Sequence, residues 1–339
     1  MWSALAVCGL LGPLASWATG NYLGIVVACG LGLFLAAMMS ADQRSRPGPP
    51  PLPARAPGPR AGRLRQLGAG DARRPWVHVA GHTRVALALR DGQVAALDFA
   101  EAGALRAPDP DGRWVAVDFP GAHARTLALA PDGTAVALED RREIGWAFGR
   151  AWTQEPGLRQ VRGLVGTDRA VLAAADGQLH RRTPRGWVAV PGVAADAVCA
   201  RGADVLAVGG GRTWRSADGG DTFAAGEAAG PAHDCALAAD GSAWLVDRGL
   251  FHSALARLGP HPRTVEAPSP RVEAVAVDPD DADHVWLGVW GEGVFRTVDG
   301  GAVWTREGLR GWEVAALVVD FGARRAWAGT GSGVLERRF

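Results

Sequence analysis

The feature that most constrains this chain is a unit of short strand signals that recurs at a near-constant interval. One copy spans Val285–Gly308 and reads VWLGVWGEGVFRTVDGGAVWTREG. It contains three short β-type runs separated by glycine-rich turns, where glycine adopts a positive φ without a steric clash. A second copy, residues 204–226, reads DVLAVGGGRTWRSADGGDTFAAG. A chain built from such units folds by stacking them.

Seven such units are visible from about residue 63 to the C-terminus. Intervals of roughly 40 residues with four short strands per unit are typical of β-propeller blades. We therefore predict an all-β fold, a seven-bladed propeller over residues 63–339, with six or eight blades as alternatives. The apolar cores, each interpreted as the second strand of its unit, are RVALALRDG (84–92), TAVALED (134–140), AVLAAADG (170–177), DVLAVGGG (204–211), SAWLVDRG (242–249), HVWLGVWGEG (284–293) and RAWAGTGSG (325–333).

Closure of the ring requires a strand from elsewhere, because the last unit offers only three strands before Phe339. An open edge would leave backbone donors and acceptors unpaired. We predict that Arg63–Gly68 pairs beside Gly333–Arg338 and completes the last blade. Residues 75–80 could serve instead if the first blade is offset.

Two turns share the pattern S/T-x-D-x-G-x-T-W/F. Residues 216–223, SADGGDTF, match it throughout, and residues 297–304, TVDGGAVW, depart from it at Val303. The aspartate can accept the N–H groups of the turn, which favours its ionised form, and we expect the aromatic residue to pack on its own blade. We predict hairpin clamps, rather than ligand or calcium contacts, at Ser216, Asp218, Gly220, Thr222, Phe223, Thr297, Asp299, Gly301 and Trp304.

These turns resemble the Asp-box, or BNR, repeat of β-propellers. The resemblance implies that the motif is structural and lies away from any active site. In its repeat the chain is also similar to the photosystem-assembly propellers of plants and cyanobacteria and to sortilin-type receptors. Those proteins work by binding other proteins, so the resemblance implies a binding function.

The N-terminal segment has no charged side chain from Ala4 to Met39. A membrane span needs about 20 residues, so we predict a transmembrane hairpin over residues 1–40, or one span over 22–39. A cleaved signal peptide is disfavoured because no positive charge precedes the apolar run. Small residues at four-residue intervals predict a face that packs against a membrane partner: Gly24, Ala28, Gly32 and Ala36.

Residues 41–62 are rich in proline, glycine and arginine, which predicts an extended spacer. We expect the protein in a bacterial inner membrane. Arginines after the apolar run favour a cytoplasmic propeller, whereas the family resemblance implies a periplasmic one. Both sides remain open at this point.

Composition argues against several classes of chemistry. Charge is balanced, with 36 basic and 35 acidic residues, so no global field favours nucleic acid. Every basic residue is arginine, which excludes a lysine Schiff base or P-loop lysine. The single tyrosine, Tyr22, lies in the apolar run, which disfavours a sialidase mechanism. We predict no catalytic residue, cofactor or metal site; Glu273, Glu292 and Glu313 are the carboxylates that a glycosidase alternative would use.

Two of the four cysteines, Cys199 and Cys235, lie one repeat apart. We place them on inner strands of adjacent blades, about three residues out of register. They are therefore predicted to be two buried thiols rather than a disulfide.

A partner surface is predicted where the loops before each inner strand meet the loops after each second strand. These loops carry His123, Arg159, His233, Asp234 and Glu273. Tryptophan and arginine dominate interface hot spots. The candidate partner residues are Trp290, Trp312, Arg310, Arg271, Arg162 and Arg125. Either tryptophan could instead pack over a blade edge.

The sequence thus predicts a membrane-anchored, non-catalytic scaffold or assembly subunit. Its partners would be membrane proteins bound through the second apolar arm and the propeller face, with no small-molecule substrate. A glycan-binding or glycosidase-like propeller is the alternative.

Overall fold

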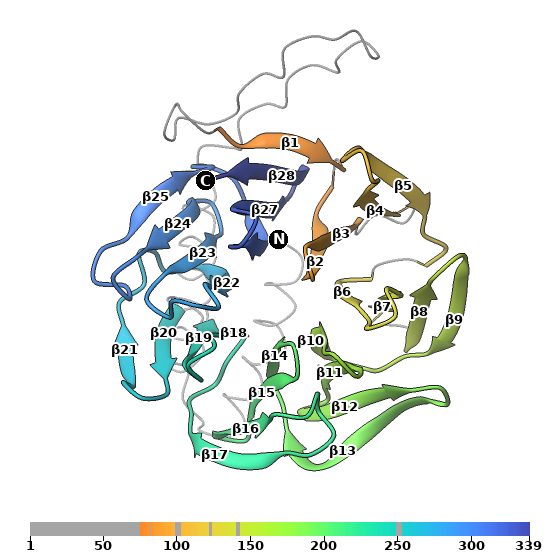
Figure 1. Ribbon diagram of the computed structural model, residues 1–339, viewed down its shortest axis with the longest axis horizontal. Coiled ribbons are helices and arrows are strands. Elements are labelled where there is room, and N and C mark those ends of the chain that lie inside the picture. Colours follow the sequence, from red (N-terminus) through yellow and green to blue (C-terminus); the bar gives the residue numbers. More distant parts are fainter. Residues whose placement is uncertain (1–74, 82, 99–102, 122–123, 140–142, 249–252) are drawn as a thin grey trace, which may run out of the picture. The chain divides into compact units, whose positions relative to one another are not determined.

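The computed structural model describes residues 75–81, 83–98, 103–121, 124–139, 143–248 and 253–339. Within these ranges, 28 strands form seven four-stranded antiparallel sheets. The sheets follow one another around a common axis, as Figure 1 shows. Innermost strands of successive sheets contact each other, and the last of them contacts the first. The prediction of a seven-bladed all-β propeller is therefore confirmed.

The innermost strands are short runs of Leu, Val and Ala that surround the axis. Both of their faces meet other parts of the protein or the central channel, so they lack polar alternation. They are β2 (Val85–Arg90), β6 (Thr126–Leu129), β10 (Val161–Gly166), β14 (Ala197–Arg201), β18 (Asp234–Leu237), β22 (Val272–Val277) and β26 (Val314–Asp320).

The second strands hold most of the core, because each lies between two neighbouring blades. They are β3 (Gln93–Asp98), β7 (Ala135–Glu139), β11 (Val171–Ala175), β15 (Asp204–Gly209), β19 (Ala243–Arg248), β23 (Val285–Val289) and β27 (Arg325–Thr330). The third strands are β4 (Ala104–Pro108), β8 (Ile144–Phe148), β12 (Gln178–Thr183), β16 (Arg212–Ser216), β20 (Ser253–Leu258), β24 (Gly293–Thr297) and β28 (Gly333–Arg338).

The outer strands are the most exposed and the most polar. They are β5 (Trp114–Asp118), β9 (Trp152–Pro156), β13 (Gly186–Ala194), β17 (Ala224–Ala228), β21 (Arg263–Val265), β25 (Thr305–Gly308) and β1 (Val77–Ala80). We number the blades 1 to 7 in the order of their inner strands, so that blade 1 is β2–β5 and blade 7 is β26–β28 with β1.

One strand assignment from the sequence was wrong. Residues 84–92 contain the inner strand β2 of blade 1, and its second strand is β3. Both kinds of strand are apolar on two faces, so local pattern does not separate them. The first two apolar cores, which start at residues 84 and 134, are therefore unusually far apart, because the first is an inner strand and the next a second strand.

Blade 7 is closed by the N-terminal strand of the described chain. β1 pairs antiparallel with β28, with Val77 opposite Glu336 and Ala80 opposite Val334. This is the second of the two segments considered for the role; residues 63–68 lie outside the described ranges. Trp76, just before β1, is 2% exposed and donates its indole N–H to the Glu307 carbonyl at 2.9 Å. The two ends of the propeller are thus joined without a covalent bond.

The predicted transmembrane hairpin (1–40), its packing face and the spacer (41–62) lie outside the described residues. In the part of the chain that the structure does describe, no helix has the length and apolarity to cross a membrane.

The segments 216–223 and 297–304 form turns held by their aspartates. Asp218 accepts the N–H groups of Asp221 (3.0 Å) and Thr222 (2.9 Å), and the Thr222 hydroxyl at 2.6 Å. Hydrogen bonds from Thr222 hold the pKa of Asp218 well below its usual range. Asp299 accepts the Thr297 hydroxyl at 2.6 Å, which lowers the pKa of that carboxyl too. Both carboxylates stabilise their turns in the ionised form.

The aromatic residue of each turn was predicted to pack on its own blade, but Trp304 packs on the preceding one. Trp304 of blade 6 donates its indole N–H to the Glu266 carbonyl at 3.1 Å and packs edge-on against Trp244 of blade 5. Phe223 of blade 4 packs on a cluster that contains both Leu172 of blade 3 and Val205 of its own blade. Blades stack face to face, so a side chain at a turn reaches its neighbour. These turns therefore join blades.

Candidate functional site

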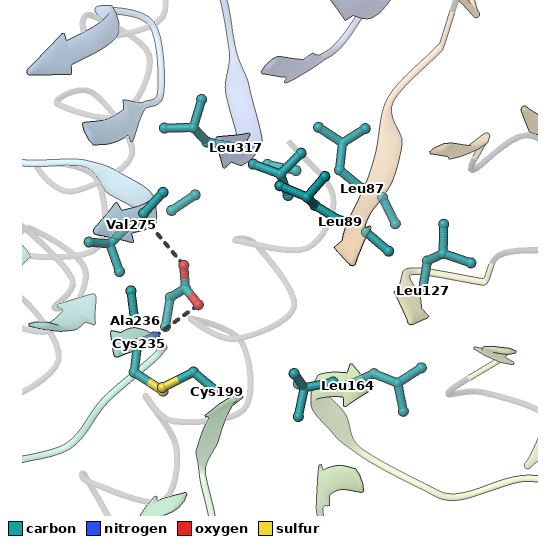
Figure 2. Close-up of a pocket in the computed structure, with 18 of the residues that line it drawn as sticks. Leu87, Leu89, Leu127, Leu164, Cys199, Cys235, Ala236, Val275 and Leu317 are labelled. Atoms are coloured by element: carbon teal, nitrogen blue, oxygen red, sulfur yellow. Dashed lines mark hydrogen bonds between the residues drawn. The ribbon is translucent and has the colours of Figure 1, made fainter. Parts of the chain in front are cut away.

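A cavity of about 760 Å³ runs along the propeller axis and is lined by all seven inner strands. Most of the residues that line it are apolar, and Figure 2 shows Leu87, Leu89, Leu127, Leu164 and Leu317 around it. Charged side chains, including Asp234, Glu273 and several arginines, also line the cavity.

One end, where the inner strands begin, is rich in arginine, and we call it the arginine mouth. Five cavity-lining arginines lie there: Arg84, Arg125, Arg162, Arg248 and Arg271. Three of them have carboxylate partners, in the pairs Arg84–Glu313 (3.3 Å), Arg162–Asp196 (2.9 Å) and Arg248–Glu273. Among the described residues, Arg125 and Arg271 have no carboxylate partner. Two of the five arginines of the mouth are therefore not paired with a described carboxylate.

Trp290 lies at this mouth between two guanidinium groups. The Cζ atom of Arg84 is 4.5 Å from its ring centroid, and that of Arg271 is 5.0 Å away. Its backbone N–H donates to the Arg271 carbonyl at 2.9 Å. Cation–π attraction on this ring orders both arginines. An aromatic ring and two oriented donors thus stand together at the entrance to the channel.

The structure brings together four of the six predicted partner residues, because Trp290, Arg271, Arg162 and Arg125 all line the cavity. Arg310 is exposed but does not line it.

The prediction that Trp312 is a partner-binding residue was wrong. Its ring is 3% exposed and packs in a core cluster with Trp286 and Val314. Only its backbone reaches the loop surface, where its carbonyl accepts the N–H of Gly291 at 2.9 Å. Gly311, directly before it, has a φ of 83°, and the chain there turns so that the ring lies inside. Trp312 therefore takes the alternative role of packing at the blade edge.

Two mouth residues were missed from the sequence. Arg84 directly precedes an inner strand, but the misassignment of β2 concealed this position. Arg248 is the last residue of the second strand β19, and Trp290 directly follows the second strand β23. Because Trp290 was identified from this position, the same position could have identified Arg248.

Asp234 is a carboxyl group in the lining of the channel. Its two carboxylate oxygens accept the N–H groups of Cys235 and Val275, each at 2.9 Å, so it links β18 to β22; dashed lines mark these bonds in Figure 2. Burial raises the pKa of Asp234 to about 6. Burial also lowers the pKa of the neighbouring His233. At neutral pH the channel therefore holds an ionised carboxylate beside an uncharged imidazole.

We expect Asp234 to destabilise the folded protein as pH rises. Its folded pKa of about 6 exceeds the ordinary value, so the stability it contributes is full below about pH 4 and is lost as pH rises through 6. Asn cannot ionise. The free energy of unfolding of wild type relative to Asp234→Asn should fall by about 2–3 kcal/mol from pH 4 to pH 8 in urea denaturation. A difference in the free energy of unfolding that is the same at both pH values would reflect only the hydrogen bond lost in the variant.

Asp204→Asn is the matched control, because this carboxylate is exposed and pairs with Arg201 at the surface. Its difference from wild type should change little between the two pH values. An equally small change for Asp234→Asn would contradict the expected burial penalty.

Of the three candidate glycosidase carboxylates, Glu273 lines the cavity, whereas Glu292 and Glu313 do not. Glu273 is buried, lines the cavity and pairs with Arg248. Glu313 pairs with Arg84, and Glu292 pairs with Arg306 at 2.6 Å. Across the described ranges, no group of three or more His, Cys, Asp or Glu side chains is arranged to hold a metal ion.

Comparison with known proteins supports the fold. No protein-family model and no curated protein matches the chain, so the Asp-box assignment stays a prediction. Among solved structures, YCF48 from Cyanidioschyzon merolae is similar, with 16% identity, a TM-score of 0.55 and coverage of 78% of this chain and 98% of that chain. YCF48 bound to D1 peptide has 14% identity, a TM-score of 0.56 and coverage of 81% and 97%.

A catalytically inactive virginiamycin B lyase from Staphylococcus aureus with quinupristin has 14% identity and a TM-score of 0.57, with coverage of 80% of this chain and 98% of that one. At these identities the likeness establishes the fold alone. This protein is therefore a seven-bladed β-propeller with an axial channel. The solved structures similar to it include both a peptide-bound protein and an enzyme.

Proposed function

We propose that this protein is a non-catalytic scaffold that holds a protein partner at its arginine mouth, as an accessory or assembly subunit of a membrane protein complex. The observation that carries the proposal is the position of Trp290 between Arg84 and Arg271 at the channel entrance. Ordered tryptophan and arginine side chains at a concave, positively charged surface suit recognition of a protein segment.

Two further observations support this function. A similar propeller, YCF48, is described as bound to a D1 peptide. The uncharged segment from Ala4 to Met39 suits a membrane anchor, with Gly24, Ala28, Gly32 and Ala36 as its packing face. The propeller then faces the cytoplasm if the arginines after the anchor determine orientation.

Partner capture tests the proposal. The tagged full-length protein is purified from native membranes in mild detergent, as wild type and as Trp290→Ala and Arg271→Glu. We expect each variant to reduce the co-purified partner at least about ten-fold while its thermal unfolding stays unchanged, as for central hot-spot residues.

The matched control is Arg201→Glu. Arg201 lines the other end of the channel and pairs with Asp204 at 2.9 Å. It should leave capture unchanged. The proposed site would be wrong if Arg201→Glu reduced partner capture as much as the two mouth variants do. It would also be wrong if Trp290→Ala and Arg271→Glu captured as much partner as wild type.

A glycan-processing function is the second candidate, because two carboxyl groups line one concave cavity in different states. Asp234 has a raised pKa, as a general acid requires, while Glu273 is paired with Arg248. Turnover of oligosaccharides that is abolished by Asp234→Asn and by Glu273→Gln would establish this candidate and refute the scaffold.

A further inference from the structure

The channel contains a pair of thiols that neither the fold nor the proposed function uses. Cys199 is the third residue of β14 in blade 4, and Cys235 is the second residue of β18 in blade 5. Both are free, with exposed fractions of 8% and 5%, and both line the channel. The side chains lie in one core cluster, and Figure 2 shows them directed toward each other.

The spacing in sequence concealed this arrangement. A register offset of about three residues was expected to keep the thiols apart. In the structure, Cys199 and Cys235 lie in one core cluster, and their side chains are directed toward each other (Figure 2). Cys199 lies on β14 and Cys235 on β18, and these two inner strands contact each other. The thiols therefore face each other across the boundary between blades 4 and 5.

We propose that Cys199 and Cys235 are an oxidisable pair that forms a disulfide between blades 4 and 5 when a small disulfide reagent enters the channel. The inference is independent of the proposed partner site. Residues 229–233 already connect blade 4 to blade 5 along the chain, and a disulfide would add a second covalent link between the inner strands of these blades.

The chemistry is thiol–disulfide exchange. One cysteine thiolate attacks a sulfur of the reagent, its S–S bond breaks, and one reagent thiolate leaves with a mixed disulfide on the protein. The second cysteine thiolate then attacks the protein sulfur of that mixed disulfide and releases the other reagent thiolate. Two protein thiols are oxidised, one disulfide is reduced to two thiols, and the two protons pass to the leaving thiolates.

The surroundings determine the rate of this exchange. Burial raises the pKa of the Cys235 thiol, and the facing Cys199 and the adjacent Asp234 raise it further. The thiolate is the reacting form, so exchange is slow at neutral pH and faster in alkaline solution. We choose a small, uncharged reagent because both sulfur atoms are buried.

The test uses the folded full-length protein incubated with 2-hydroxyethyl disulfide at pH 8.5, followed by non-reducing peptide mass mapping. We expect a cross-linked peptide containing Cys199 and Cys235. The bond closes a loop of 36 residues, so the melting temperature should rise by about 5–10 °C, and a reductant should reverse the rise.

Cys199→Ser and Cys235→Ser are the paired controls, each of which should abolish both the cross-link and the rise in melting temperature. Cys8→Ser/Cys29→Ser should keep both. Recovery of free thiols at 199 and 235 after incubation, of only mixed disulfides with the reagent, or of links between molecules would overturn the proposal.

Discussion

A chain that begins at Asp71 should fold, whereas a chain that begins at Gly81 should lose its cooperative unfolding transition. The shorter chain lacks β1 and Trp76, so β28 becomes an open edge beside an emptied site in the core. Loss of a buried tryptophan alone typically destabilises by about 3–5 kcal/mol. Loss of the strand ladder adds to this, against a total stability of only about 5–15 kcal/mol.

Guanidinium denaturation monitored by tryptophan fluorescence measures the effect. Both chains lack the apolar N-terminal segment, so the comparison isolates the closing strand. A synthetic peptide of residues 71–81 should restore the transition of the shorter chain, because it can pair with the exposed edge of β28. A cooperative transition of equal midpoint in both chains would refute the role of β1 in closure.

The second large effect is expected at Glu307, which joins blade 6 to blade 7. Its carboxylate, on β25, pairs with Arg337 of β28 at 2.7 Å and with Arg296 of β24 at 2.8 Å. Glu307 and Arg337 are 7% and 5% exposed. Arg337→Met leaves a buried carboxylate with one fewer partner, so the free energy of unfolding should fall by about 3–5 kcal/mol.

Two comparisons isolate the buried pair. Arg338→Met removes the adjacent arginine, whose side chain is 77% exposed and 4.0 Å from Glu336, and should change stability by less than about 0.5 kcal/mol. The double variant Glu307→Leu/Arg337→Met should recover most of the loss, because apolar replacement removes both buried charges. Equal effects of Arg337→Met and Arg338→Met in urea denaturation would contradict this account.

Much of the candidate site followed from strand order. Arg125, Arg271 and Trp290 lie in loops and Arg162 lies near the start of β10, so their end of the channel is determined once the blades are identified. Arg84 was lost through a single strand misassignment. The direction of the Trp312 ring was not encoded locally, because the same glycine-flanked loop can present a tryptophan outward or fold it beneath the blade.

The sequence by itself determined the β-propeller, its seven blades and the need for a closing N-terminal strand. These depend on local signals, namely alternation, turn glycines and a period near ~40 residues. Only the tertiary structure decided that β1 closes the ring, that Trp304 packs on the preceding blade, and that Cys199 faces Cys235. Contacts between blades depend on how successive sheets rotate about the axis, and no pattern within one repeat specifies that rotation.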